Sequence, residues 1–471
     1  MNEQVIKNYV ESLWDNSIIS TLSHYISIPN KSPAYDPLWE KQGYMDEAVA
    51  VMTAWCQANA PAGMHLEVLR HPGRTPLIYI EIEGQSKDTV LFYGHLDKQP
   101  EMVGWHPELG PWKPVIQGDK LYGRGGADDG YAIFSSLTSI LALQHQNIPH
   151  ARCVILIEAS EESGSIDLPF YLDLLSDRIG QPSLLICLDS GAGNYEQMWM
   201  TTSLRGNFIG ELHVSLLKEG VHSGMGSGIV ADSFRVAREL LSRIEDEKTG
   251  KILLKELHVP IPENRVQEAQ KCADALRENI YSALPFQEGV KPVSEDLVEL
   301  LLNRTWRPAL SITGVAGLPP LENAGNVSRP TTALKLSMRL PPMCEPKVVK
   351  EAMTKVLETN PPYNAHVKFH SEDCIGQGWN APATAPWLEQ VCQEASQAFF
   401  GKPAVCSGEG GTIPFINMVG QKFPASQFVI TGVLGPASNA HGPNEFLHIP
   451  TAKKLTACIA MIVARQYALR T

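Results

Sequence analysis

Three short apolar runs, each ending on ionisable residues, constrain the fold of this chain more than any other feature. The runs are "TVLFYGHLD" (89–97), "RCVILIEAS" (152–160) and "SLLICLDS" (183–190). Their length and their content of Val, Ile and Leu are typical of buried strands. Helical patterns separate the runs, so we expect a mostly parallel sheet that is covered by helices.

The surrounding segments extend this α/β pattern. Helical periodicity covers 3–27, 43–60 and 131–146, and two further strand-like runs lie at 65–70 and 76–84. The same style resumes in a helical pattern at 387–401 and a strand-like run at 427–433. We therefore predict one catalytic domain with a mixed, mostly parallel sheet covered by helices, built from residues 1–202 and 378–471.

The residue pattern changes near residue 203. "SLRGNFIGELHVSLL" (203–217) alternates as a half-exposed strand does, and it can offer an open edge. Strand-like runs at 332–340 and 365–372 flank a helical pattern, and residues 250–310 show no regular pattern. We predict that residues 203–377 form an inserted α+β domain.

Bulk properties narrow the function classes. The chain has 471 residues with a net charge of −12, which argues against nucleic-acid binding as the main activity. The apolar runs are far shorter than a membrane span, so no membrane association is expected. The nine cysteines are scattered without a C-x-x-C pair, which favours reduced thiols and a cytoplasmic protein.

Polar side chains gather where the predicted strands end. In open α/β sheets ligands bind beyond the carboxyl ends of the strands. Burying so many acids without a cation costs several kcal/mol per unpaired charge, so we predict a pair of divalent metal ions. Histidine and carboxylate ligands without thiolate suit zinc, manganese or cobalt. The candidate residues are His95, Asp97, Asp128, Asp129, Glu161, Glu162, Asp189 and His441.

Local spacing suggests roles for four of these residues. On an extended segment residues i and i+2 face the same way, so His95 can bind a metal while Asp97 holds its other ring nitrogen. The adjacent Glu161 and Glu162 point differently. One of them can bind metal, and the other can accept a proton from the attacking water.

The order of eight motifs adds a resemblance that covers about residues 91 to 450. The motifs are "GHLD", "GRGGADDG", "EESGS", "LDSG", "HSGMGSG", "SMRL", "EGGTIP" and "NAHGPNE". They resemble the two-metal amidohydrolase and peptidase family of aminoacylase, glutamate carboxypeptidase and succinyl-diaminopimelate desuccinylase, in particular its branch of carnosinase and cytosolic non-specific dipeptidase.

The resemblance implies metal and catalytic roles. His95 and Asp189 would bind one metal, Glu162 and His441 the other, and Asp128 would bridge both. Asp97 would orient His95, and Glu161 would be the general base and later the acid. It also implies a cis peptide bond between Asp128 and Asp129.

Further implied roles concern the substrate and a second subunit. Arg339 and Thr412 would hold the substrate's free carboxylate, and Glu409 would line the pocket. Asn326 stands where the branch usually has a threonine, and "DDGYA" replaces the usual "DDKG". His222 would reach the active site of a neighbouring subunit, so the inserted domain would be a dimerisation and lid domain of a homodimer.

We therefore expect a two-metal hydrolase, with zinc as the first candidate, that acts on dipeptides or other small peptides. A deacylase of N-acyl amino acids is the alternative within the same chemistry. A binding or scaffold protein that has lost catalysis is a further alternative, which the intact ligand positions and Glu161 argue against.

Overall fold

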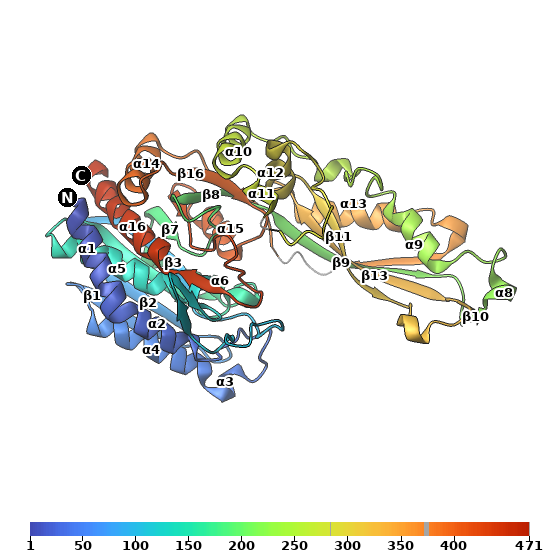
Figure 1. The fold of residues 1–471 in the computed structure, drawn as a ribbon, viewed down its shortest axis with the longest axis horizontal. Helices are drawn as coiled ribbons and strands as arrows, with labels where there is room; N and C mark the ends of the chain where they lie inside the picture. Colours follow the sequence, from blue (N-terminus) through green and yellow to red (C-terminus); the bar gives the residue numbers. More distant parts are fainter. Residues whose placement is uncertain (283, 372–375, 471) are drawn as a thin grey trace.

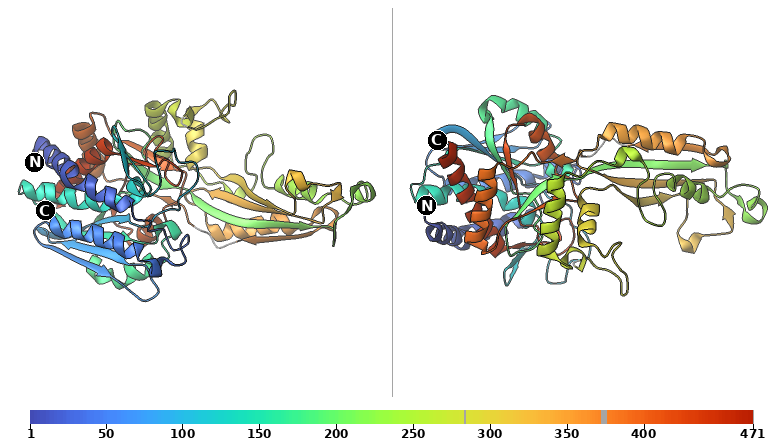
Figure 2. Two further views of the ribbon diagram at one scale, coloured as in Figure 1. Left: turned by 60° about the horizontal axis from the view of Figure 1, so that its bottom comes forward. Right: turned by 90° about the horizontal axis from the view of Figure 1, so that it is seen from above.

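A computed structural model describes residues 1–282, 284–371 and 376–470. Figure 1 shows a rounded body that holds both termini and an arm that extends from it, and Figure 2 shows the arm in two further views. No helix in these described ranges is both long and apolar enough to cross a membrane. The body carries the predicted strands and therefore the polar strand ends.

The body is built on a six-stranded sheet with the order β1-β2-β6-β3-β7-β17. The four strands β6, β3, β7 and β17 are parallel, while β2 pairs antiparallel with β6 and β1 pairs antiparallel with β2. This arrangement confirms the mixed, mostly parallel sheet predicted from the sequence. The strand bounds are β1 (Met64–Leu69), β2 (Leu77–Ile82), β3 (Ser86–His95), β6 (Ala151–Glu158), β7 (Pro182–Cys187) and β17 (Gln427–Ile430).

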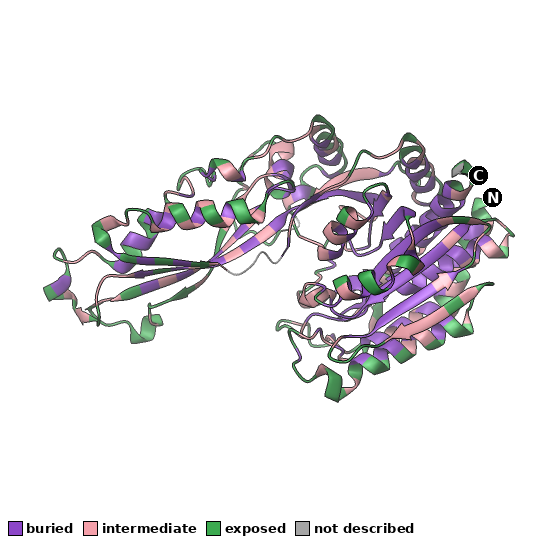
Figure 3. Ribbon diagram, turned by 180° about the vertical axis from the view of Figure 1, so that it is seen from behind, coloured by how far each residue is buried: buried purple, intermediate pink, exposed green. Residues whose placement is uncertain are grey.

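Helices cover both faces of this sheet, which explains why its strands are continuously apolar. Val90 and Phe92 point into one core, and Leu91 and Tyr93 point into the other. Figure 3 shows the central strands as almost wholly buried. Helices on the first face are α1 (Glu3–Leu13), α2 (Ile19–Ile26), α4 (Tyr44–Ala58), α5 (Ala132–His145), α14 (Pro386–Phe400) and α16 (Ile449–Arg470), while α6 (Leu168–Leu174) and α15 (Pro414–Lys422) lie on the second.

The arm contains a separate antiparallel sheet with the order β11-β13-β9-β14. Alternate side chains of β9 are buried under two helices, as the alternation at 203–217 predicts. The prediction that this strand offers an open edge is wrong, because β9 pairs with β13 on one side and β14 on the other. The elements are β9 (Gly206–Ser215), β11 (Ala309–Ala316), β13 (Thr331–Leu340), β14 (His366–Ser371), α9 (Ser233–Leu241) and α13 (Pro346–Glu358).

Residues 250–310 are more regular than the sequence suggests. They contain α10 (Glu263–Leu276), α11 (Asn279–Ser282) and α12 (Leu297–Thr305). The buried face of α10 uses small residues such as Ala269 and Ala273, so its apolar periodicity is weak. These helices pack beside Trp199 and Val405 at the base of the arm, and the domain boundaries at 202/203 and 377/378 stay a prediction.

Short strands form smaller sheets elsewhere in the described chain. One small sheet has the order β15-β8-β16, and another has the order β18-β5-β4. A third pair, β10-β12, lies at the end of the arm away from the body (Figure 1). The bounds are β4 (Val115–Gln117), β5 (Lys120–Tyr122), β8 (Trp199–Leu204), β10 (Val221–His222), β12 (Val327–Ser328), β15 (Trp379–Asn380), β16 (Val405–Glu409) and β18 (Phe446–His448).

Candidate metal centre

The carboxyl ends of three neighbouring parallel strands bring the polar residues together. His95 is the last residue of β3 and lies opposite Glu158, the last residue of β6. Asp189 follows β7 by two residues, and Asp128 comes from the turn before α5. Residues from motifs that are distant in sequence therefore lie side by side at this edge of the sheet, as predicted from their positions at the strand ends.

A glycine before the histidine makes this close packing possible. A Cβ at Gly94 would lie 2.5 Å from the Cβ of Ala132 and 2.6 Å from the Oδ2 atom of Asp129. The same Oδ2 atom accepts a hydrogen bond from the backbone N–H of His95 at 3.2 Å. Gly94 is thus required for Asp129 to hold the backbone of the metal-binding candidate.

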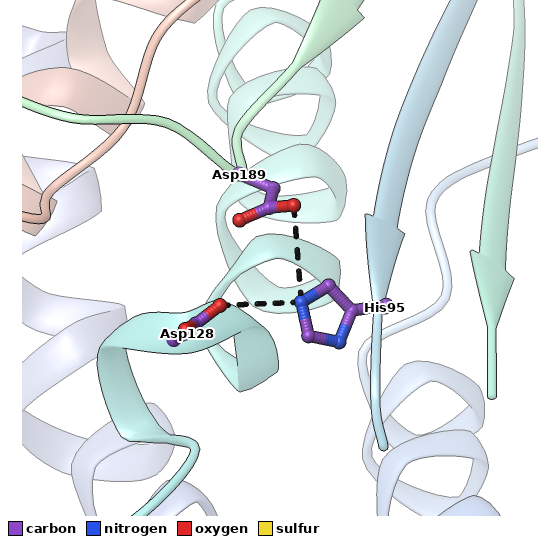
Figure 4. A group of neighbouring side chains, drawn as sticks. All are labelled: His95, Asp128 and Asp189. Carbon is purple, nitrogen blue, oxygen red and sulfur yellow. Dashed lines mark hydrogen bonds and ion pairs between the residues drawn. The ribbon is translucent and has the colours of Figure 1, made fainter. Parts of the chain in front are cut away.

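The first candidate group contains His95, Asp128 and Asp189 (Figure 4). The Nε2 atom of His95 lies 3.3 Å from Oδ1 of Asp128 and 3.8 Å from Oδ2 of Asp189. All three side chains are buried or nearly so. One nitrogen and two oxygen donors face a common point, which is a donor set suited to a divalent cation.

The second candidate group shares Asp128 and adds Glu162 and His441. The Nε2 atom of His441 lies 3.1 Å from Oδ2 of Asp128 and 3.3 Å from Oε2 of Glu162. The two oxygens of Asp128 therefore face the two groups separately, which is the arrangement of a carboxylate that bridges two ions. The peptide bond between Asp128 and Asp129 is cis, as the resemblance implies.

Asp97 contacts His95 and also organises the glutamate pair. The Nδ1 atom of His95 lies 3.1 Å from the backbone oxygen of Asp97 and 3.5 Å from its Oδ1 atom. The two carboxylate oxygens accept the backbone N–H groups of Glu161 and Glu162, at 3.1 and 3.0 Å. Asp97 thus sits beside the outer nitrogen of the imidazole, as expected, and it anchors both glutamates, which the sequence did not suggest.

The charges at the site fit bound cations. Burial, followed by the charge of Asp189, raises the pKa of Glu161 well above its usual value. Burial and the neighbouring Asp128 do the same for the pKa of Glu162, and burial raises the pKa of Asp189 to about 6. Divalent cations would offset this mutual repulsion and the desolvation of the carboxylates. The residues present therefore match the two-metal site expected from the sequence.

The two glutamates occupy different positions. Glu162 belongs to the second donor group, and its Oε2 atom accepts a hydrogen bond from Gln99 at 2.5 Å. Glu161 belongs to neither group. Its carboxylate is close enough to Asp189 and His95 to sense their charges. Of the two glutamates, only Glu162 therefore belongs to a candidate metal group among the described residues.

The remaining predicted residues lie in two other places. Arg339, Thr412 and Glu409 lie at the junction of body and arm, where Oγ1 of Thr412 donates to the backbone oxygen of Arg205 at 2.5 Å. His222 and Asn326 lie together at the end of the arm, where the backbone N–H of Ser223 donates to the oxygen of Asn326. The chain thus does not bring His222 or Asn326 to its own metal groups (Figure 1).

Sequence reasoning missed several polar residues at the centre. Gln99 continues the i, i+2 spacing of His95 and Asp97, so its place on the same side of the chain could have been predicted from the sequence. Glu158 is buried behind the centre, where the hydroxyl of Tyr93 donates to it at 2.6 Å. A buried ion pair between Arg124 and Glu445 spans 321 residues and fixes the segment after His441, and no local pattern predicts it.

Several known proteins are similar to this chain in sequence or in fold. The sequence profile described as "Peptidase family M20/M25/M40" matches residues 91–465. Human Beta-Ala-His dipeptidase is 24% identical over 453 residues, which cover 92% of this chain and 87% of that protein. The Cys-Gly metallodipeptidase DUG1 of Saccharomyces cerevisiae is 28% identical over 385 residues, which cover 77% of this chain and 76% of that protein. The solved structure of human carnosine dipeptidase 1 has a similar fold, with a TM-score of 0.76, 20% identity and 99% of each chain covered.

Proposed function

Because this chain belongs to peptidase family M20/M25/M40, we propose that it hydrolyses the amide bond of dipeptides or small peptides with a free C-terminal carboxylate. The observation that carries this proposal is the pair of donor groups that share Asp128, with Glu161 beside them and outside both. Two divalent cations would be held by His95, Asp128 and Asp189 and by Asp128, Glu162 and His441. Zinc is the first candidate, with manganese and cobalt as alternatives that the same donors accept.

The protein residues would share the catalytic work as follows. Bound cations supply Lewis-acid activation of a water molecule and of the substrate carbonyl. Glu161 accepts the proton of the attacking water and later donates it to the leaving amine. The carboxylate of Asp97 holds the backbone of Glu161 in place, since its Oδ1 atom accepts the backbone N–H of that residue.

The junction of body and arm would bind the C-terminal end of the substrate. Arg339 is partly buried on β13, and no ion pair links it to a carboxylate among the described residues. A guanidinium group suits a carboxylate in a two-pronged geometry. Thr412 lies on the neighbouring loop and is the second candidate for this contact.

The end of the arm would complete the site of a second subunit. His222 is exposed, and its Nδ1 atom accepts only a local hydrogen bond from the backbone of Gly224. Since it lies far along the arm from its own metal groups, a role in catalysis requires a neighbouring chain (Figure 1). We propose a homodimer in which His222 stabilises the oxyanion in the partner's site, with Asn326 beside it.

The cellular compartment would be the cytoplasm. Eight cysteines in the described ranges are free, and seven of them are buried. Free thiols in this number suit a reducing compartment.

A substrate panel tests the proposed function against its nearest alternative. Zinc- or manganese-loaded enzyme is expected to release amino acids from neutral dipeptides such as Ala-Leu and to leave N-acetyl-leucine largely intact. C-terminally amidated dipeptides should react at least about tenfold more slowly, because they lack the charge that Arg339 binds. Faster cleavage of N-acetyl amino acids than of any dipeptide would identify a deacylase instead.

A further inference from the structure

A cavity lies close to the candidate metal centre, beside the loop that follows Asp189. Its volume is about 380 Å³, which falls within the roughly 300–1,000 Å³ of small-molecule sites. One wall contains Gly191, two residues after Asp189, and Leu434, on the segment that leads to His441. These two wall residues form a β-bridge with each other. A group in this cavity would therefore sit next to the loops that carry two of the candidate metal ligands.

The other walls carry one acid and one base. Glu409 ends β16, and its Oε1 atom lies 2.6 Å from where a Cβ of Gly191 would be. Arg304 lies in the last turn of α12. Burial raises the pKa of the Glu409 carboxyl, and the charge of Arg304 opposes that rise, so the two side chains sense each other. They lie too far apart for an ion pair, which leaves space between them.

Arg304 has no carboxylate partner among the described residues. Two further arginines stand nearby, since the charges of Arg339 and Arg304 both lower the pKa of Arg205, after burial. Arg205 donates to the backbone oxygens of Asn303 and Gly410 at 3.2 and 3.3 Å, so its guanidinium is already used. If Arg339 binds the C-terminal carboxylate of a substrate, Arg304 remains available to bind a second carboxylate.

The charges of the cavity indicate which end of a substrate enters it. Arg339 is not among the residues that line the cavity, so the C-terminal end of the substrate lies elsewhere. Glu409 would repel a carboxylate and attract an ammonium group. The N-terminal residue of a dipeptide carries such a group. A second carboxylate on that same residue would match Arg304.

We propose that the cavity binds an N-terminal residue that carries both a free ammonium group and a second carboxylate. Glu409 binds the ammonium group and Arg304 binds the carboxylate. Aspartyl and glutamyl dipeptides have this chemistry, whether the amide is formed by the α-carboxyl or by the side-chain carboxyl. This proposal rests on the proposed peptidase function, and it names the substrate class for that site.

The test compares kcat/KM for Asp-Leu, its β-linked isomer, Asn-Leu and Ala-Leu. We expect one or both aspartyl peptides to exceed Asn-Leu by about tenfold, the value of one hydrogen bond to a charged group. Arg304→Met should abolish this ratio, and Arg304→Lys should restore part of it. Arg307→Met is the matched control, because Arg307 pairs with Glu299 at 2.6 Å outside the cavity and should leave the ratio unchanged.

A binding measurement separates recognition from turnover. Calorimetry with metal-loaded enzyme should show tighter binding of free L-aspartate than of L-asparagine, by about the same factor, and Arg304→Met should remove the difference. Equal kcat/KM values for aspartyl and asparaginyl peptides, or a preference that survives Arg304→Met, would overturn the inference and leave the peptidase function standing. Failure to cleave any dipeptide would instead contradict the proposed function and this inference with it.

Discussion

Replacing Glu161 by Gln is expected to lower kcat by about 10² to 10⁴-fold while both metal ions stay bound. The magnitude is that of general acid–base catalysis by one positioned carboxylate. Glu161 lies outside both donor groups, so its loss should not weaken metal binding. The amide keeps the shape of the side chain and removes its ability to accept a proton. Turnover of a dipeptide and metal content per chain are the two measurements.

Glu162→Gln is the matched contrast for this prediction. Glu162 is adjacent in sequence but belongs to the second donor group with Asp128 and His441. This variant should lose metal content as well as activity. Near-normal turnover in Glu161→Gln would remove Glu161 from the mechanism. Loss of a metal from Glu161→Gln with retention in Glu162→Gln would show that the two roles are exchanged.

Replacing His222 by Ala is expected to slow turnover by about 10² to 10³-fold, the effect of one lost oxyanion donor. His222 is exposed at the end of the arm and contacts none of the candidate ligands. Metal content and the oligomeric state should therefore stay unchanged. Kinetics, metal analysis and sedimentation of the same preparation check the three parts. His213→Ala on β9 is a control, because the described contacts of that exposed histidine are with Glu211 and His370 of its own sheet.

Mixing two inactive variants tests whether His222 acts across a dimer. A chain with His222→Ala and a chain with Glu161→Gln are combined, and their subunits are allowed to exchange. One site of the mixed dimer would hold Glu161 from its own chain and His222 from its partner, so activity should return. No recovery after demonstrated exchange would place His222 within its own chain or outside the mechanism. Full activity of a strictly monomeric enzyme would end the proposal.

The convergence of the strand ends could be predicted because it follows from a general property of parallel sheets. His95 ends β3 and Asp189 follows the neighbouring β7 by two residues, and the helices on both faces require those strands to be apolar. The alternation of β9 likewise predicts a sheet with one buried face. The edge status of β9 could not be predicted, because strand order in the arm depends on pairing with β13 and β14, far away in the sequence.

Other parts of the site depend on contacts that leave no local pattern. The ion pair of Arg124 and Glu445 joins two motifs that can each be recognised in the sequence, but neither motif predicts that these two side chains are in contact. Arg304 lies in α12, which buries Leu301 and Leu302, and nothing in that leucine-rich run indicates that its arginine lines the same cavity as Glu409 of β16. Asp97 accepts hydrogen bonds from the backbone N–H groups of Glu161 and Glu162. Because nearly every residue type carries the same backbone N–H, the sequence gives no sign of this contact.

Titration of metal-free enzyme with zinc is the most direct measurement of two-metal peptide hydrolysis by this chain. Cleavage of Ala-Leu is followed while zinc is added to protein that has been stripped by a chelator. Activity should be near zero without metal, should rise with added zinc and should level off at two equivalents per chain. Unchanged hydrolysis in the stripped protein, or no dipeptide cleavage at any zinc load, would contradict the two-metal peptidase proposed from His95, Asp128, Glu162, Asp189 and His441.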